Sequence, residues 1–408
     1  MTVDLFEKFD ATLNNFRQLP EGESNPFTVS MEKILSPTEA IINGRKTILA
    51  GTNNYMGMTF NEEAVAAAQD ALLTQGTGTT GSRVLNGTYN SHKALEEELK
   101  KFYGTEHAMV FSTGYQANLG IIATLAGPKD YILIDADSHA SIYDGCAMGN
   151  ATVIRFAHND PENLDKRLTR LRKSDPEAGV LVVVEGVYSM LGDQAPLKEL
   201  AAVSKKHNAY ILVDEAHSIG VFGATGRGVA QAQGVEDQID FIVGTFSKSV
   251  GTIGGYCVSN HPKFEVLRLV CRPYMFTASL PPSVVASATK ALQIIANTNL
   301  REKLLANSMR LNKGLAKIGF NMGTTGESPI AAIIVPDMHQ AIAFWGEMIK
   351  EGVYVNLALP PATPNNYNLM RCSLSAAHTN EQIDYMLEKF ELVGRKLGIL
   401  SDKALETV

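Results

Sequence analysis

A lysine flanked by small residues lies near the middle of the chain. The segment GTFSKSVGTIGG (Gly244–Gly255) places Thr245 three residues before Lys248. A partly desolvated lysine amine can form a Schiff base with an aldehyde cofactor. The small neighbours would let a planar cofactor approach the backbone, and the Thr245 hydroxyl could donate to a phosphate. A surface lysine in a Gly/Ser loop has the same pattern, so the interpretation needs support from other motifs.

A second motif, VDEAHS (Val213–Ser218), follows an apolar run that predicts a strand. A carboxylate at the carboxyl end of such a strand points into the crevice where α/β proteins bind ligands. Asp214 could pair with a pyridinium nitrogen and keep a cofactor ring protonated. Ala216 is small enough to lie against the ring, and His217 could bond to its hydroxyl or to a substrate. An N-cap or a metal-binding acidic pair would explain the same residues.

A third motif, FSTGYQANLG (Phe111–Gly120), predicts a strand end, small residues and then the start of a helix. The backbone amides of Gly114 and Tyr115 would then form an anion site at the helix N-terminus. An ordinary capped helix is the alternative. The segment gains functional meaning only together with Lys248 and Asp214.

Two further motifs each contain one side chain suited to a cofactor or a substrate. DADSHASIYDG (Asp135–Gly145) also follows a predicted strand, and a neutral His139 could stack on a pyridine ring. LMRCSLSAAHT (Leu369–Thr379) contains Arg371 in an alternating strand pattern, where a guanidinium suits an α-carboxylate. A structural histidine and a salt-bridging strand arginine are the alternatives.

The elements that would position these residues alternate between strands and helices. Short β-branched apolar runs predict strands buried on both faces of a mostly parallel sheet. These runs are AMVF (108–111), YILI (131–134), TVIRF (152–156), VLVVVE (180–185), AYILVDE (209–215) and DFIVGT (240–245). Helical patterns lie between them, and a Pro-Pro pair opens a longer helix over 281–298. The order after about residue 300, helix, strand, helix, strand, helix, predicts a smaller α+β domain.

The expected organisation is therefore α/β with two domains. An N-terminal segment over 1–59 would contribute a helix and part of the small domain or an interface. A large cofactor-binding domain would cover 60–295, and a small C-terminal domain 296–408.

Composition excludes several classes of function. The net charge is −7 without a basic block, so no nucleic-acid partner is expected. The four cysteines are far apart and form no CxxC pair, which argues against a zinc site and against disulfides; we expect no metal. No signal peptide or membrane span is recognisable, which predicts a cytoplasmic protein.

An apolar stripe runs along the helical pattern at the N-terminus. Its members are Leu5, Phe6, Phe9, Leu13 and Phe16. The stripe predicts a helix packed on its own protein or on a second subunit. Peripheral membrane association is the weaker alternative, because the neighbouring charges are mostly acidic and membrane-surface helices are usually basic.

Taken together, the motifs resemble the α-oxoamine synthase family of fold-type I enzymes dependent on pyridoxal 5'-phosphate (PLP). The resemblance extends from about Asn25 to about Gly398 and includes EGVYSMLGD (Glu185–Asp193). Within the family the chain is most similar to bacterial enzymes that condense L-serine with palmitoyl-CoA. The segments that carry this similarity are Asn54–Phe60, Gly81–Thr88, Cys271–Ser287 and Pro360–Pro364.

The resemblance implies a role for each matching residue. Lys248 would hold PLP and act as the acid-base group, Asp214 would face the ring nitrogen, and His139 and His217 would contact the ring and its hydroxyl. Phosphate contacts are implied for Gly114, Tyr115, Thr245 and, from a second subunit, Thr277; Ser189 would support the ring oxygen, and Arg371, Asn54 and Ser82 would contact the substrate.

The implied protein is a homodimer with active sites at the subunit interface. The implied reaction joins L-serine to a long-chain acyl-CoA, releases CoA and CO2 and gives 3-ketodihydrosphingosine, the first sphingolipid intermediate. The apolar residues around Tyr274–Pro282 could line a groove for the acyl chain, and helix packing at a dimer interface would explain the same residues equally well. Two positions depart from the pattern of the bacterial enzymes: Asn53 stands where Tyr is expected, and Leu359 where Arg is expected.

These departures bear on the substrate and leave the PLP residues untouched. The alternatives are therefore other members of the family, namely 8-amino-7-oxononanoate synthase, 2-amino-3-ketobutyrate CoA ligase and amino-ketone signal synthases. A catalytically silent scaffold is a different class of protein, and the presence of Lys248 and Asp214 argues against it.

Overall fold

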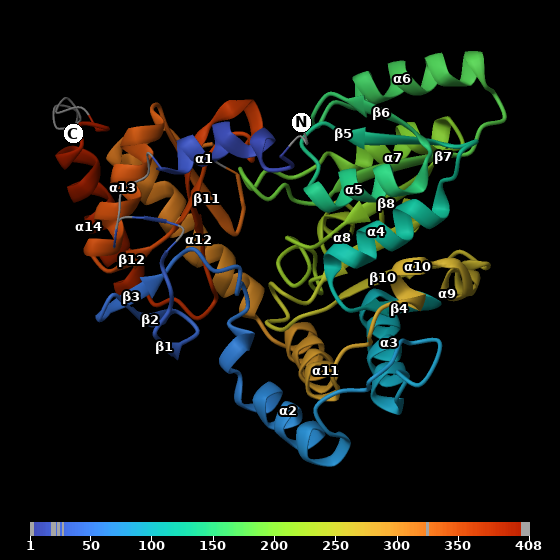
Figure 1. Ribbon diagram of the computed structural model, residues 1–408, viewed down its shortest axis with the longest axis horizontal. Coiled ribbons are helices and arrows are strands. Elements are labelled where there is room, and N and C mark those ends of the chain that lie inside the picture. Colours follow the sequence, from blue (N-terminus) through green and yellow to red (C-terminus); the bar gives the residue numbers. More distant parts are fainter. Residues whose placement is uncertain (1–3, 18–21, 23–24, 27, 324–325, 401–408) are drawn as a thin grey trace.

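The central layer is a seven-stranded sheet with the order β4-β10-β9-β8-β7-β5-β6 (Figure 1). The computed structural model describes residues 4–17, 22, 25–26, 28–323 and 326–400. The strands are β4 (His107–Phe111), β5 (Tyr131–Asp135), β6 (Thr152–Phe156), β7 (Val180–Glu185), β8 (Tyr210–Asp214), β9 (Phe241–Thr245) and β10 (Gly255–Ser259). All of the strands expected from the apolar runs form, and the prediction of an α/β fold with a mostly parallel sheet is confirmed.

Strand β10 was not expected from the sequence, and it lies antiparallel between β4 and β9. Its pattern GYCVS is short and interrupts the alternation of strand and helix along the chain. The return strand directly follows the Lys248 segment, so β9 and β10 fix both ends of that segment.

Helices cover both faces of this sheet because the strands are apolar on both sides. In β7, Val182 and Val184 belong to one core cluster, whereas Leu181 and Val183 belong to the other. Successive side chains of a strand point to opposite faces, so a continuous apolar run requires cover on each. The longer helices of this region are α2 (Glu62–Gln75), α3 (Asn90–Tyr103), α4 (Gly114–Leu125), α5 (Ala140–Gly149), α6 (Pro161–Ser174), α7 (Leu197–Lys206) and α11 (Pro282–Asn297), and the short ones are α8 (Val229–Ala232), α9 (Leu267–Val270) and α10 (Arg272–Met275).

The C-terminal elements form a second, smaller layered unit after α11 (Figure 1, orange and red). They are α12 (Leu300–Ile318), β11 (Ile330–Val335), α13 (Met338–Lys350), β12 (Val353–Tyr354), β13 (Asn356–Ala358), β14 (Asn368–Ser373) and α14 (Asn380–Lys396). Strand β14 lies between β11 and β13 in a three-stranded antiparallel sheet. The sequence pattern had indicated the helices and the longer strands of this unit.

The N-terminal strands join this C-terminal unit although they are more than 300 residues away in sequence. Strands β1 (Lys33–Ser36), β2 (Glu39–Ile42) and β3 (Arg45–Leu49) form a meander, and β3 pairs in parallel with β12. Figure 1 shows these blue strands beside the red elements. The domain boundaries at 59/60 and 295/296 stay a prediction.

The expected N-terminal helix forms as a short 3-10 turn followed by α1 (Asp10–Arg17). Leu5, Phe6, Phe9 and Leu13 are exposed. Residues 1–3 and 18–20 and the Phe16 side chain lie outside the described residues. Among the described residues, no helix is both long and apolar enough to cross a membrane. The cytoplasmic location stays a prediction.

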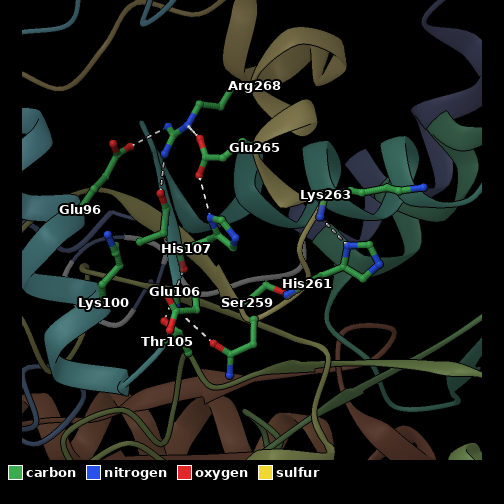
Figure 2. Close-up of polar contacts among 12 residues, drawn as sticks. Glu96, Lys100, Thr105, Glu106, His107, Ser259, His261, Lys263, Glu265 and Arg268 are labelled. Carbon is green, nitrogen blue, oxygen red and sulfur yellow. Dashed lines mark hydrogen bonds and ion pairs between the residues drawn. The ribbon is translucent and has the colours of Figure 1, made fainter.

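Arg268 lies nine residues before Thr277 and bonds to Glu96 and Glu265 (Figure 2). Its Nη1 donates to Glu96 Oε1 at 3.0 Å, its Nε to Glu265 Oε2 at 2.6 Å and its Nη2 to the Ala108 carbonyl at 2.6 Å. Glu96 also accepts from Arg83 at 2.9 Å. These charge-assisted bonds hold Arg268 against β4 and α3.

Candidate active site

A cavity of about 340 Å³ lies at the carboxyl ends of β5, β7, β8 and β9. Loops from several parallel strands meet at this edge of an α/β sheet, which is where such folds bind ligands. Its lining comprises Thr113, Gly114, Tyr115, Asn118, His139, Ser141, Glu185, Asp214, Ala216, His217, Gly244, Thr245, Ser247, Lys248, Ile253 and Gly254. Four separate sequence motifs therefore meet in one place.

Lys248 contributes its side chain to this cavity from the turn between β9 and β10. The side chain is half-buried rather than directed into open solvent. Burial lowers the pKa of its ammonium group, while the negative charges of Asp214 and Glu185 act in the opposite direction. A larger neutral fraction makes this amine a better nucleophile than an ordinary surface lysine.

Asp214 is the last residue of β8 and is 5% exposed. Its Oδ2 accepts a hydrogen bond from Asn118 Nδ2 at 2.7 Å, and its Oδ1 accepts from the Ala216 amide at 2.8 Å. Asn118 also donates to Ser141 Oγ at 3.0 Å. These bonds fix the carboxylate in orientation and leave it facing the cavity, where a cationic ring nitrogen would complete its partners.

The N-terminus of α4 forms another wall of the cavity. Thr113 is the N-cap, and its Oγ1 accepts from the Gln116 amide at 3.0 Å. The amides of Gly114 and Tyr115 have no intrahelical acceptor in a helix that begins here. A Cβ on Gly114 would lie 2.7 Å from Thr245 Cβ, so only glycine lets β9 and α4 approach this closely.

His139 caps the N-terminus of α5 and lines the same cavity. Its Nδ1 lies 2.8 Å from Ser141 Oγ, and its backbone amide donates to Glu185 Oε1 at 2.6 Å. Burial lowers the pKa of His139 and raises that of Glu185 well above its usual value. A neutral imidazole is thus held over the cavity, in the form that can stack on an aromatic ring.

His217 is held by a residue that the sequence motifs did not single out. Its Nδ1 lies 2.7 Å from the hydroxyl of Tyr55, which is completely buried. Burial lowers the pKa of His217 well below its usual value, and the positive charge of Lys248 acts in the same direction. The imidazole is therefore neutral and fixed in orientation.

Arg371 lies beside this cavity and is 5% exposed on β14. Its Nε donates to the Ser189 carbonyl at 2.6 Å, and its Nη1 donates to Ser373 Oγ at 2.7 Å. Both terminal nitrogens lie 3.3 Å from Asn53 Oδ1. Asn53, one of the two positions that differ from the pattern of the bacterial enzymes, thus contacts the Arg371 guanidinium that is expected to bind the substrate carboxylate.

Some residues expected in the site lie outside the lining of this cavity. Ser189 lines an adjacent cavity of about 480 Å³, which shares His139 with the first. Asn54 donates to Thr59 Oγ1 at 2.8 Å, and Ser82 pairs with the backbone of Ala278. Thr277 Oγ1 accepts from Gln116 Nε2 at 3.2 Å.

Sequence reasoning missed Asn118, Glu185 and Tyr55 as parts of this arrangement. Asn118 lies one helical turn after Gly114, and Glu185 ends the apolar run of β7, so each carried a positional signal. Tyr55 carried none, because it is 162 residues from the histidine it contacts. Only the folded chain brings Tyr55 and His217 together.

The residues present suit PLP better than a metal. The cavity combines a lysine of lowered pKa, a buried carboxylate, a neutral imidazole and free amides at a helix N-terminus, which match an aldehyde, a pyridinium, a ring face and a phosphate. The described part of the chain contains no cluster of three or more His, Cys, Asp or Glu side chains arranged for a metal ion. The four cysteines are free and buried.

The fold and this site define a PLP-type enzyme, and the chain belongs to the aminotransferase class I and II family, whose profile matches residues 45–390. The chain is 56% identical to the serine palmitoyltransferase of Caulobacter vibrioides (strain NA1000 / CB15N), over 98% of each chain. These similarities confirm the family resemblance seen in the motifs.

Two solved structures closely resemble the fold. A Sphingomonas wittichii serine palmitoyltransferase superposes with a TM-score of 0.94 at 59% identity and covers 98% of this chain and 100% of its own. A serine palmitoyltransferase variant from S. paucimobilis, solved with a bound PLP–myriocin aldimine, superposes with a TM-score of 0.94 at 55% identity and the same coverage.

Proposed function

We propose that the protein condenses L-serine with palmitoyl-CoA, as a serine palmitoyltransferase that requires PLP. The observation that carries the proposal is the convergence of Lys248 and Asp214 on one cavity with the N-terminus of α4. Full-length similarity to serine palmitoyltransferases supports this choice within the family.

PLP, when bound, supplies an aldehyde that accepts amines and a ring that withdraws electrons from the substrate Cα. Lys248 is the residue that would hold it and that would move a proton at Cα. Asp214 would keep the ring nitrogen protonated through charge. The neutral imidazoles of His139 and His217 would contact the ring face and the ring hydroxyl.

The phosphate would be held by the amides of Gly114 and Tyr115 and by the Thr245 hydroxyl. This assignment is supported by the close approach of α4 and β9, which only a glycine at 114 permits. Thr277 would add a contact from a second subunit. Its position outside the cavity of its own chain is compatible with that role.

The substrate carboxylate would pair with Arg371, whose buried guanidinium is oriented by Ser189, Ser373 and Asn53. Asn54 and Ser82 would contribute further substrate contacts, and Ser189 would support the ring oxygen. A bidentate pair with Arg371 would fix the amino acid so that its Cα–H faces the Lys248 amine.

The overall reaction forms one C–C bond and breaks two bonds, the C–S bond that releases CoA and the Cα–carboxylate bond that releases CO2. Serine loses its Cα proton to the Lys248 amine, and Cα attacks the thioester carbonyl of palmitoyl-CoA. The C–S bond breaks, and CoA leaves as the thiol after it takes up a proton. The Cα–carboxylate bond then breaks to release CO2, and a proton returned to Cα gives 3-ketodihydrosphingosine.

The test is a panel of amino acids and acyl-CoAs with purified protein reconstituted with PLP. We expect the highest kcat/KM with L-serine and palmitoyl-CoA, and 3-ketodihydrosphingosine as product. A higher kcat/KM with alanine and a pimeloyl thioester, or with glycine and a short acyl-CoA, would assign the chain to one of the alternative synthases. Failure to bind PLP at all would refute the proposal.

We also propose that the protein is a homodimer with interfacial active sites. Support comes from strongly exposed apolar side chains at Leu73, Leu85 and Phe276, the last of which precedes Thr277. Sedimentation equilibrium should give twice the chain mass.

Weak peripheral membrane association through the exposed apolar side chains of the N-terminal helix is a separate possibility. A lack of affinity for liposomes in a flotation assay would exclude it.

A further inference from the structure

A histidine outside the cavity lies between two carboxylates from different segments of the chain, and a third carboxylate, that of Asp137, lies 3.9 Å from its Nδ1. His158 follows β6, and its Nδ1 lies 2.8 Å from Oδ1 of Asp135, the fully buried last residue of β5. Its Nε2 lies 2.8 Å from Oδ2 of Asp193, which follows β7. The ring also meets Tyr188 edge-on at 4.5 Å between centroids.

Both ring nitrogens must donate to satisfy these two acceptors, so the imidazole is protonated. Although burial by itself lowers the pKa of His158, hydrogen bonds to Asp135 and Asp193 raise it to about 10. A charged ring with both nitrogens occupied has no proton to exchange with a substrate at neutral pH. His158 is therefore suited to hold other groups in place rather than to act as an acid or a base.

The group that His158 holds is a projecting hairpin over residues 186–195. Its ends are joined by the bond from the Ala195 amide to the Gly186 carbonyl at 3.0 Å, and Tyr188 N donates to Asp193 O at 2.9 Å. From the side of β6, Asn159 Nδ2 adds a second donor to Asp193 Oδ2 at 2.8 Å. The hairpin is thus fastened to the sheet through the Asp193 carboxylate.

The tip of this hairpin contacts Arg371. The Ser189 carbonyl accepts from Arg371 Nε at 2.6 Å, and this bond sets the rotation of the guanidinium about its long axis. The terminal nitrogens are then directed toward Asn53 and Ser373. His158 is thus linked to Arg371 through Asp193, whose carbonyl accepts from the Tyr188 amide, and through the next residue along the chain, Ser189, whose carbonyl accepts from Arg371.

We propose that His158 is a positioning residue for Arg371, which it orients through the 186–195 hairpin. The inference rests on the proposed function, because it assigns to Arg371 the binding of the serine carboxylate. Without the imidazolium, Asp193 loses its main partner and the hairpin tip can shift away from Arg371 Nε. A shift of this kind weakens carboxylate binding and leaves the PLP cavity intact.

The test is the kinetics of His158→Gln, which can offer only one amide group where the imidazolium offers two opposed donors. We expect the KM for L-serine to rise about tenfold, as for the loss of about 1.4 kcal/mol of binding, with kcat changed less than about threefold. PLP absorbance and the KM for palmitoyl-CoA should remain at the wild-type values. An unchanged serine KM, or an equal loss for both substrates, would overturn the inference.

A matched control is His207→Gln, which removes another histidine bonded to an aspartate. His207 Nε2 lies 2.6 Å from Asp165 Oδ1 on the α6–α7 side of the sheet, with no link to the hairpin. Its serine KM should equal that of the wild type. If His158→Gln does not fold, Asp193→Asn tests the same link, and the same rise in serine KM is expected.

A double-mutant cycle with Arg371→Lys separates positioning from a general structural effect. Because His158 is proposed to act through Arg371, its replacement should add little in the Arg371→Lys background. Full additivity, or an Arg371→Lys variant with wild-type serine KM, would overturn the inference. Failure of the wild-type protein to use serine would instead overturn the proposed function.

Discussion

Among single residues, Lys248 carries the most specific expectation. In Lys248→Ala, borohydride should no longer trap PLP on the chain, and kcat should fall by a factor of about 10²–10⁴, as for loss of a positioned acid-base group. Absorbance after reduction and a turnover assay check both effects. Lys263→Ala, which alters an exposed lysine, should leave both unchanged; a trapped adduct in Lys248→Ala would place the reactive amine elsewhere.

Asn118 is the residue whose importance follows from geometry rather than from a motif. In Asn118→Ala, Asp214 loses a 2.7 Å bond from an amide. Bonds to charged groups contribute about 1.5–3 kcal/mol, so kcat should fall roughly 10- to 100-fold while PLP remains bound. Steady-state kinetics with PLP absorbance as the control measure this. Wild-type kcat would mean that the Ala216 amide alone suffices to hold the carboxylate.

His158 also predicts a pH dependence of stability. Its pKa is raised from 6.5 to about 10 in the folded protein, so the folded state binds this proton more tightly than the unfolded state does. The resulting stabilisation is fully present below about pH 6.5 and declines as pH rises toward about 10. Urea unfolding should show this decline for the wild type and a flatter profile for His158→Gln. Parallel profiles would contradict the predicted proton linkage.

Among the elements, the N-terminus of α4 lies against the end of β9 at the proposed phosphate site. In Gly114→Ala, the new Cβ would meet Thr245 Cβ at 2.7 Å, so the helix N-terminus must move away from β9. PLP affinity should fall at least about tenfold while the circular dichroism spectrum is preserved. Gly127→Ala, beyond the other end of α4, is the control, because its new Cβ has no neighbour closer than 3.7 Å. Equal PLP affinity in both variants would contradict a phosphate site here.

On the scale of the whole molecule, the N-terminal meander completes the C-terminal unit. Leu49 on β3 is 3% exposed, and its strand pairs with β12. Leu49→Ala should lower the free energy of unfolding by about 2–5 kcal/mol, as for other buried leucines. Leu392→Ala, on the half-exposed side of α14, should cost far less. Similar unfolding midpoints for both variants would show that the meander does not stabilise the unit.

The sequence by itself determined six of the seven strands of the large sheet and the motifs that line its edge. Short, β-branched, continuous apolar runs favour strands covered on both faces, and a polar residue that ends such a run in a parallel sheet lies at the ligand-binding edge. Asp214, His139 and the Lys248 segment could therefore be predicted to lie together. This reasoning did not depend on any contact distant in sequence.

Only the tertiary structure decided which residues orient these groups. Tyr55 meets His217, Asn53 and Ser189 meet Arg371, and His158 meets Asp193, although each pair is separated by tens to hundreds of residues. The sequence pattern likewise did not predict the pairing of β3 with β12 or the antiparallel strand β10. Periodicity reports which face of its own element a side chain occupies. It carries no information on what another segment brings to that face, and this information arises only when the chain packs.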